Sequence, residues 1–501
     1  MIDHLEYDQI LNFADRYALG FEKGKDSRHF LRVMIPNGMI TAEQFRKIGK
    51  ISEKFCRNYA EITTRQDIQM HWIDGENAID AFEVLEELGF TTDKCGQARP
   101  IAHYGDVRNI VGCPLTGIDP KEILDCSPFV RELKKFISGN RAFMDLPRKF
   151  KISISGCPIN CTSPEIQDIG LVAVRNNSGE IGFIALLGGG TGVPARIGVP
   201  LGLFIPRDEC VDVIIALLEI FRDYGKRDSK ARSRFKFLVD EWGIEKIRDN
   251  LRNKFGTRLE VFDQKPLDAS GNEHIGINSQ KQEGYYYVNF PIQNGELTDN
   301  QMFAIADIAE KYGWPEIRLT PFQNLILVGI RRENLTGLIL EMEKIGFDIR
   351  KAPFQWMSLS CRQDFCTLAV TNDSVSARTR EIVEYLEKKF SPGLGNLDIK
   401  ISVSGCPSAC SRYPVADIGL QAALYHENGI AHAGYNVYIG GGLGRNPSFG
   451  RLVRRAVDKD KINTSLEKLI SSYIRERTPA ENFRDFYGKK TIEELSKLLE
   501  V

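Results

Sequence analysis

The stretch Lys151-Ile-Ser-Ile-Ser-Gly-Cys157-Pro-Ile-Asn-Cys161 occurs twice in this chain with only small changes. The second copy is Lys400-Ile-Ser-Val-Ser-Gly-Cys406-Pro-Ser-Ala-Cys410, and the tetrapeptide Asp-Ile-Gly-Leu follows each copy, at 168–171 and 417–420. A repeat of this length indicates two copies of one structural unit. Differences between the copies are then expected where chemistry was added to a shared scaffold.

The composition is that of a globular protein with more than one domain. The chain has 501 residues, 42% hydrophobic and 27% charged, which is longer than one hydrophobic core usually holds. Its net charge of −1 gives no general attraction to nucleic acid or membranes, so neither is expected as a partner. The N-terminus, Met1-Ile-Asp-His-Leu-Glu, has no signal-peptide pattern, and no apolar run reaches the ~18 residues that span a bilayer. We therefore expect a cytoplasmic protein.

The duplication extends over most of the chain. Met34-Ile-Pro-Asn-Gly-Met-Ile-Thr returns as Pro291-Ile-Gln-Asn-Gly-Glu-Leu-Thr, and each predicts a strand, an Asn-Gly turn and a helix with a threonine N-cap. A second strand (Glu61–Gln66 and Ile317–Gln323) and a second helix (78–88 and 335–345, ending at Gly89 and Gly346) are expected in each copy. This β-α-β-α order is typical of small ferredoxin-like units.

A larger α/β stretch follows each small unit. Strands at Phe150–Ser155 and Ile399–Ser404 alternate with helices, and the Gly-Gly-Gly runs after Leu187 and Ile439 predict strand-to-loop turns. The polar segment Lys265–Glu283 contains no strand pattern and is the expected linker. The expected fold is α+β and internally duplicated, with an N-terminal extension (1–25), two ferredoxin-like half-domains that pair (26–95 and 282–352) and two larger α/β domains (96–270 and 353–501).

The second copy carries two close pairs of cysteines. Eleven cysteines, an odd number in a chain without a secretion signal, argue against a disulfide framework. Cys361 and Cys366, with Cys406 and Cys410, supply the four thiolates that an iron–sulfur cluster needs. A zinc site and buried thiols without a ligand are the alternatives that the residues alone leave open. Four other cysteines have no partner at metal-ligand spacing and are expected to be buried thiols: Cys56, Cys95, Cys126 and Cys210.

Four motifs resemble the ferredoxin-dependent, assimilatory sulfite and nitrite reductases. In chain order they are Thr63-Thr-Arg65-Gln66, Gly105-Asp-Val-Arg108-Asn109-Ile-Val-Gly-Cys113-Pro114, Leu146-Pro-Arg-Lys149-Phe-Lys151 and Gly405-Cys406-Pro-Ser-Ala-Cys410. The resemblance covers residues 26–490 and implies two cofactors, siroheme and a [4Fe-4S] cluster. It also implies that the two half-domains pair, that the two larger units flank the siroheme, and that sulfite or nitrite is reduced by six electrons.

The resemblance assigns roles to individual residues. Cys361, Cys366, Cys406 and Cys410 hold the cluster, and Cys410 also bridges it to the siroheme iron. Arg65, Arg108, Lys149 and Lys151 face the substrate, and together with Asn109 and Cys410 they contact the siroheme. Such cations suit the task, since charge-assisted hydrogen bonds hold an oxyanion and positioned lysines supply protons.

Simpler interpretations stand beside these assignments. Most lone arginines, such as Arg65, are solvated or ion-paired, and Lys149 and Lys151 also fit the wet side of an edge strand. The family usually separates the first cysteine pair by five residues, whereas four separate Cys361 and Cys366 here. The first copy keeps Cys113, Cys157 and Cys161, which we matched to Cys366, Cys406 and Cys410, and a relic of duplication is favoured over a second metal site. His71 and His103 are expected to be structural.

The substrate prediction depends on Lys151. Nitrite reductases of the family typically carry asparagine at this position and sulfite reductases carry lysine, so sulfite is favoured and nitrite is the alternative. No segment has the pattern of a flavin or NADPH module, so electrons are expected from ferredoxin or a similar small carrier. The remaining alternative is a siroheme- or zinc-binding protein without catalysis.

Overall fold

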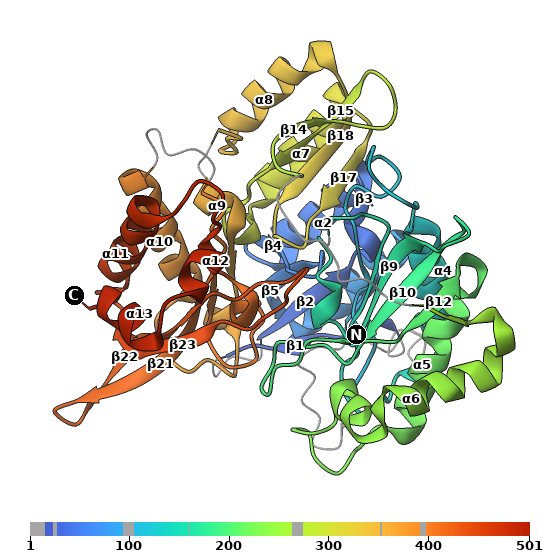
Figure 1. Cartoon of the computed structure of the whole chain (residues 1–501). Coiled ribbons are helices and arrows are strands. Elements are labelled where there is room, and N and C mark those ends of the chain that lie inside the picture. The colour runs from blue at the N-terminus through green and yellow to red at the C-terminus, as the bar shows by residue number, and fades with distance from the viewer. Residues whose placement is uncertain are drawn as a thin grey trace. The chain divides into compact units, whose positions relative to one another are not determined.

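The structure is a computed structural model that describes residues 16–23, 28–93, 105–159, 161–262, 274–350, 353–390 and 397–500 (Figure 1). Compact packing divides it into two units, one made mainly of residues up to 347 and the other of residues 348–501 with two short segments around 191–195 and 291–295. Both combine helices with sheets that contain antiparallel strands, which confirms the α+β class. The domain boundaries expected from the sequence stay predictions.

Two ferredoxin-like half-domains lie in the first unit, each a sheet with two helices. The first half-domain contains β1 (Gly20–Phe21), β2 (Arg28–Met34), β3 (Met39–Thr41), α2 (Ala42–Phe55), β4 (Ala60–Ile62), β5 (Ile68–Asp74), α3 (Ala78–Glu87) and β6 (Thr91–Thr92). The second contains β14 (Ile277–Ser279), β15 (Tyr285–Phe290), β16 (Glu296–Leu297), α7 (Asp299–Tyr312), β17 (Glu316–Leu319), β18 (Leu325–Arg331) and α8 (Leu335–Lys344). The expected order of strands and helices is therefore present in both copies.

The helix starts and ends follow the sequence signals. Thr41 and Thr298 each form a capping box, in which the threonine hydroxyl accepts from the amide of Gln44 or Gln301 and that glutamine side chain accepts from the threonine amide. Gly89 and Gly346 follow the second helices with positive φ, as expected for residues that end a helix. These local features were predicted correctly because they depend on a few neighbouring residues.

The two half-domains complete each other's sheets. β3, from the first copy, pairs with β17 of the second, and β16, from the second copy, pairs with β4 of the first. Helices α2 and α7 pack together, with Phe303 so close to Gly49 that an added methyl group would lie 2.8 Å from its ring. The pairing of the half-domains, which the resemblance implied, is thus built from both backbone and helix contacts.

One expectation about the linker was wrong. The segment Lys265–Glu283 was expected to contain no strand, but β14 lies within it and pairs antiparallel with β15. The strand is only three residues long and partly exposed, so it lacks the apolar alternation that marks a strand in sequence. Residues 263–273 of this segment lie outside the described part of the chain.

Each larger α/β domain is built on the same strand pattern. In the first unit the sheet runs β13 (Glu260–Val261), β12 (Leu203–Pro206), β10 (Ile181–Leu187), β9 (Ile169–Arg175), β8 (Ile152–Ser155) and β7 (Val111–Gly112), with β11 (Val199–Pro200) beside β10. In the second unit it runs β19 (Ser358–Ser360), β20 (Ile401–Ser404), β21 (Ile418–Glu427), β22 (Ile430–Ile439) and β23 (Arg451–Asp458). β7, β8 and β9 are parallel, as are β19, β20 and β21, and antiparallel strands follow in both sheets.

Helices cover these sheets and bury their cores. The first sheet packs against α4 (Ser127–Ile137), α5 (Cys210–Tyr224) and α6 (Phe235–Phe255). The second packs against α9 (Pro353–Met357), α10 (Val375–Phe390), α11 (Ile462–Glu476), α12 (Phe483–Gly488) and α13 (Ile492–Leu498). The expected glycine turns follow β10 and β22, where Gly189 and Gly441 approach neighbouring backbone carbonyls too closely for any side chain.

Candidate active site

Arg65 lies in a tight turn and not in a strand. The strand expected over Glu61–Gln66 ends at Ile62, because the Thr63 hydroxyl accepts hydrogen bonds from the amides of Arg65 and Asp67, both at 3.2 Å. The Thr63 amide in turn donates to the Asp67 carbonyl at 2.9 Å. This hairpin turn between β4 and β5 fixes the backbone from which Arg65 projects.

The Arg65 guanidinium is held by uncharged acceptors. It donates to the Gln167 side chain at 3.0 Å, to the Asn109 carbonyl and to the Ile152 carbonyl at 3.4 Å. Its Nε is buried without a hydrogen-bond partner among the described residues. Burial lowers the pKa of Arg65 to about 10, against the opposing effect of Asp67. A buried cation with spare donor capacity is suited to binding an anion.

Arg108 and Asn109 support this cation in different ways. Arg108 is buried and ion-paired with Asp93 and Asp106, each at 3.2 Å. The buried Asn109 amide donates to the Ile35 carbonyl at 2.8 Å and to the Arg65 carbonyl at 3.0 Å, so it fastens the turn that carries Arg65. The Asn109 Oδ1 has no partner in the described part of the chain.

Lys149 and Lys151 flank a core residue at the entrance to β8. Phe150 is fully buried between them, and its backbone is bonded on both sides, to the Asp106 carbonyl and the Arg108 amide, each at 2.8 Å. In an extended segment, alternate side chains point to opposite sides, so the two half-buried lysines share the side away from the core. The strand begins at Ile152, later than expected, and the lysines lie just before it.

The structure brings these four cations around one short segment. Arg65 donates to the Ile152 carbonyl, and the Arg108 amide donates to the carbonyl of Phe150, the residue between the two lysines. The Arg108 charge also contributes to lowering the pKa of Arg65. The Arg65 Nε and the Asn109 Oδ1, which have no hydrogen-bond partner among the described residues, belong to the same group. This set fits a carboxylate-rich tetrapyrrole and a small oxyanion.

The second cysteine site (Cys361, Cys366, Cys406 and Cys410) lies in the other unit, where two parallel strands end together. Cys361 follows β19 and Cys406 comes soon after β20. The Cys361 sulfur accepts a hydrogen bond from the Gly405 amide at 3.1 Å, and the Cys366 sulfur accepts from the Leu368 amide at 3.4 Å. Burial raises the pKa of the Cys361 thiol, and the nearby Cys410, Cys406 and Cys366 add to this rise.

The loop from Cys406 to Cys410 turns sharply. Ala409 has a left-handed backbone (φ 55°), and its amide donates to the Cys406 carbonyl at 3.4 Å. Cys406 is buried whereas Cys410 is exposed. Cys361 lies within electrostatic reach of the other three thiols, and four thiols are the ligand set that a [4Fe-4S] cluster needs.

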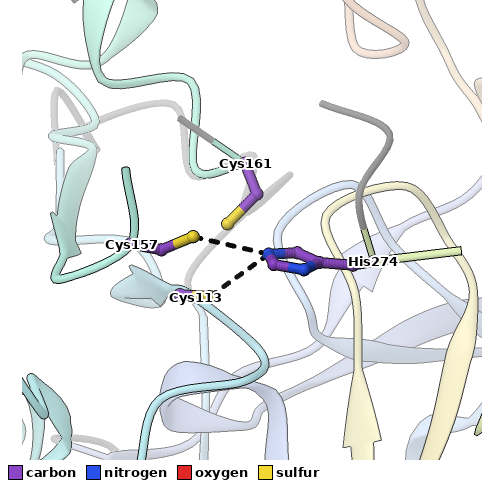
Figure 2. Close-up of side chains that lie close together, drawn as sticks. All are labelled: Cys113, Cys157, Cys161 and His274. Atoms are coloured by element: carbon purple, nitrogen blue, oxygen red, sulfur yellow. Dashed lines mark hydrogen bonds between the residues drawn. The ribbon is translucent and has the colours of Figure 1, made fainter. Parts of the chain in front are cut away.

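A first cysteine site (Cys113, Cys157, Cys161 and His274) lies in the first unit, and its histidine was missed in the sequence (Figure 2). Strand register also corrects our matching of the copies. Gly112 pairs with Ile154 as Ser360 pairs with Val403, so Cys113 corresponds to Cys361 and not to Cys366. The sequence signal that was available is a set of three cysteines that lacks a fourth ligand. No nearby residue pattern points to His274.

Cys56, Cys126 and Cys210 are buried free thiols, as expected, whereas Cys95 and His103 lie outside the described residues. His71 is buried between Glu22 and Gln69, at 2.7 and 3.0 Å, consistent with a structural role. In the described part of the chain, no helix is both long and apolar enough to cross a membrane.

Comparison with known proteins decides the family. The model for the nitrite and sulphite reductase 4Fe-4S domain matches residues 104–259 and 363–501, and that for the nitrite/sulfite reductase ferredoxin-like half domain matches 22–88 and 278–345. The chain belongs to the nitrite and sulfite reductase family. Siroheme and a [4Fe-4S] cluster are the cofactors of this family, and the cation set and the second cysteine site fit them.

Similar proteins of both kinds are equally close in sequence. An assimilatory ferredoxin-dependent nitrite reductase of Haloferax mediterranei is 31% identical, over 92% of this chain and 82% of that protein. Sulfite reductase [ferredoxin] 2 of Mycolicibacterium paratuberculosis is also 31% identical, over 91% and 82%. The structure of the Mycobacterium tuberculosis NirA protein superimposes with a TM-score of 0.88 at 27% identity, covering 99% of this chain and 92% of that one.

Proposed function

We propose that this chain reduces sulfite to sulfide by six electrons, with a ferredoxin as electron donor. The observation that carries the proposal is the pair Lys149 and Lys151, which flank buried Phe150 and lie beside Arg65 and Arg108. The ferredoxin is inferred from the names of similar proteins, which are ferredoxin-dependent enzymes. The described residues include ten cysteines and no disulfide between them, which fits a reducing compartment, and we propose the cytoplasm.

The cofactor contacts follow from the two groups of residues. We propose that Cys361, Cys366, Cys406 and Cys410 hold the [4Fe-4S] cluster, and that Arg65, Arg108, Asn109, Lys149, Lys151 and Cys410 contact the siroheme. When bound, the two cofactors supply the electrons for reduction. Of these four thiols, Cys410 is the exposed one, as a role shared between the two cofactors requires.

The protein's own residues position the oxyanion and supply protons. Arg65 can offer its Nε, which has no hydrogen-bond partner in the described part of the chain, and the two lysines offer ammonium donors from one side of the chain. Each oxygen of the substrate leaves as water and takes up two protons, which the lysine ammonium groups can deliver and then recover from solvent. Asn109 keeps Arg65 in place by bonding its carbonyl.

Charge favours sulfite over nitrite. Sulfite has three oxygens and carries up to two negative charges, whereas nitrite has two oxygens and one charge, so a second lysine contributes more to sulfite binding. Nitrite is the second candidate substrate, because the Haloferax nitrite reductase is as similar in sequence as the sulfite reductase.

Lys151→Asn tests the substrate preference. The kcat/KM for sulfite and for nitrite is measured with a reduced viologen dye on the holoenzyme. Loss of one charged hydrogen bond should lower the sulfite-to-nitrite ratio by about tenfold or more. Lys400→Asn is the matched control, since the Lys400 amide bonds to Asp417 at 2.9 Å just as the Lys151 amide bonds to Asp168 at 2.8 Å. An unchanged ratio in Lys151→Asn contradicts the proposal, and a wild type that reduces nitrite alone supports the second candidate.

A further inference from the structure

The first cysteine site gathers four ligand atoms in the interior of the first unit. The sulfurs of Cys113, Cys157 and Cys161 and a ring nitrogen of His274 all lie within 4.8 Å of one another, and all four residues are buried. Figure 2 shows the three thiols and the imidazole converging, with His274 Nε2 at 3.8 Å from the Cys113 sulfur and 3.5 Å from the Cys157 sulfur. The proposed reduction uses none of these residues.

We propose that these four residues bind one zinc ion in a tetrahedral Cys3His site, separate from the cofactors of the reductase. Three thiolates and an imidazole are a common ligand set for structural zinc. Four protein ligands also fill the coordination sphere, so the ion holds the fold together and activates no substrate.

The spacing of the ligand atoms fits one ion and not a cluster. Zinc–sulfur bonds of about 2.3 Å and zinc–nitrogen bonds of about 2.0 Å, at a tetrahedral angle, place sulfur and nitrogen about 3.5 Å apart. The Cys157 sulfur, at 3.5 Å from His274 Nε2, lies at this value, and the Cys113 sulfur, at 3.8 Å, lies slightly above it. In a [4Fe-4S] cluster each ligand binds a different iron, so its ligand atoms stand further apart by the width of the cluster.

His274 argues against a relic of duplication. In the second copy the fourth ligand, Cys366, lies in the loop after Cys361, and the same spacing from Cys113 leads to Ile118. The first copy instead obtains its fourth donor from a distant segment, ahead of β14. An unused set of thiols gives no physical reason for a histidine to be buried against two of its sulfurs.

The surrounding structure holds the ligands in place. The Asn289 side chain donates to the His274 carbonyl at 2.9 Å, and the Ile159 amide donates to the Cys157 sulfur at 3.5 Å. The loop after Cys113 is bonded to the same segment, since the Lys281 amide donates to the Ile118 carbonyl at 2.8 Å and the Gln282 side chain to the Gly117 carbonyl at 2.9 Å. The ion would therefore fasten the start of the second half-domain to the first large sheet.

Metal content and X-ray absorption of the intact holoenzyme test this proposal. Protein purified without oxygen should contain one zinc per chain besides the iron of its cofactors. The zinc-edge spectrum should show three sulfurs at about 2.3 Å and one nitrogen at about 2.0 Å. Extra cluster iron in place of zinc, or no metal beyond the reductase cofactors, overturns the proposal.

Variants identify the ligands. His274→Ala should lose most of its zinc, and His274→Cys should keep zinc with a fourth sulfur in the spectrum. His432→Ala is the matched control, because His432 stacks on Tyr425 in the other unit and should leave the zinc content unchanged. Full zinc content in His274→Ala contradicts the site, and if that variant does not fold, His274→Cys and the wild-type spectrum still decide.

Discussion

The two cysteine sites share one scaffold but differ in enclosure and in the origin of their fourth ligand. In the first, β7 and β8 carry Cys113 and Cys157, and the fourth donor is His274, from outside the repeated loop. In the second, Cys361 and Cys406 follow β19 and β20, and the fourth thiol, Cys366, lies in the loop just after Cys361. All four ligands of the first site are buried, whereas Cys410 of the second is exposed.

This contrast teaches how a duplicated unit can divide its work. A closed, fully buried ligand set is suited to a structural ion, because nothing needs to reach it. A set with an accessible sulfur is suited to passing electrons onward. The same division holds at the hairpin turns, where the first copy carries Arg65 and the second carries Phe322 at the equivalent position.

Replacing one cysteine in each site should give the largest difference in activity between two matched variants. Cys410→Ser is expected to lose the cluster and abolish reduction of both sulfite and nitrite, since a ligand of the electron-transfer centre is gone. Cys161→Ser should lose zinc and thermal stability but keep most of the activity per folded molecule. Iron and zinc content, the visible spectrum and viologen-dependent turnover distinguish the two. Equal loss of activity in both variants would contradict the division of work.

The hairpin turns offer the next test. Arg65→Gln is expected to lower kcat/KM by about 10²–10³-fold, as for the loss of one donor that stabilises developing negative charge. Phe322→Leu, in the equivalent turn of the second copy, should change kcat/KM little. The Thr63 and Thr320 hydroxyls accept the same backbone bonds in the two turns, so neither exchange removes the turn itself. A large effect of Phe322→Leu would show that the turns are not functionally distinct.

Asp67 and Asn324, at equivalent positions of these turns, make a prediction about pH. Burial, aided by Asp93, raises the pKa of Asp67 to about 7, while its unfolded-state pKa is near 4. Between these values the unfolded chain loses its proton and the folded chain keeps it, so this group lowers stability as pH rises from 4 to 7.

Asp67→Asn removes that loss and makes the first turn resemble the second. Its melting temperature relative to the wild type should be higher at pH 8 than at pH 5, by the equivalent of at most about 3 kcal/mol. Asp74→Asn, at the exposed end of β5, is the control and should show no such trend. A difference between Asp67→Asn and wild type that does not vary with pH would count against a raised pKa.

The capping threonines should show the smallest effect and no difference between copies. Thr41→Ala and Thr298→Ala each remove the same capping box from α2 or α7, and each should cost about 1 kcal/mol of unfolding free energy. Denaturant titration of each variant measures this. Unequal costs would mean that the two paired helices contribute differently to stability.

Local signals predicted much of the fold and of the cation set. Threonine caps, the glycines that end helices and the Gly-Gly-Gly turns depend on near neighbours, so the sequence is sufficient for them. Strand register is different, because pairing between distant segments sets it. The correspondence of Cys113 with Cys361, the short strand β14 and the approach of His274 all depend on such pairing and could not be predicted from spacing alone.

The exchange of β3 and β16 between the half-domains has a consequence for how the protein must be assembled. A half-domain made alone would expose an uncovered sheet edge, which invites self-association. Two separate halves would pair only at protein concentrations above their dissociation constant. Fusion in one chain gives each half a high effective concentration of the other at any dilution. Joining the copies in one chain thus makes the formation of the paired sheets, and of the turn that carries Arg65, independent of protein concentration.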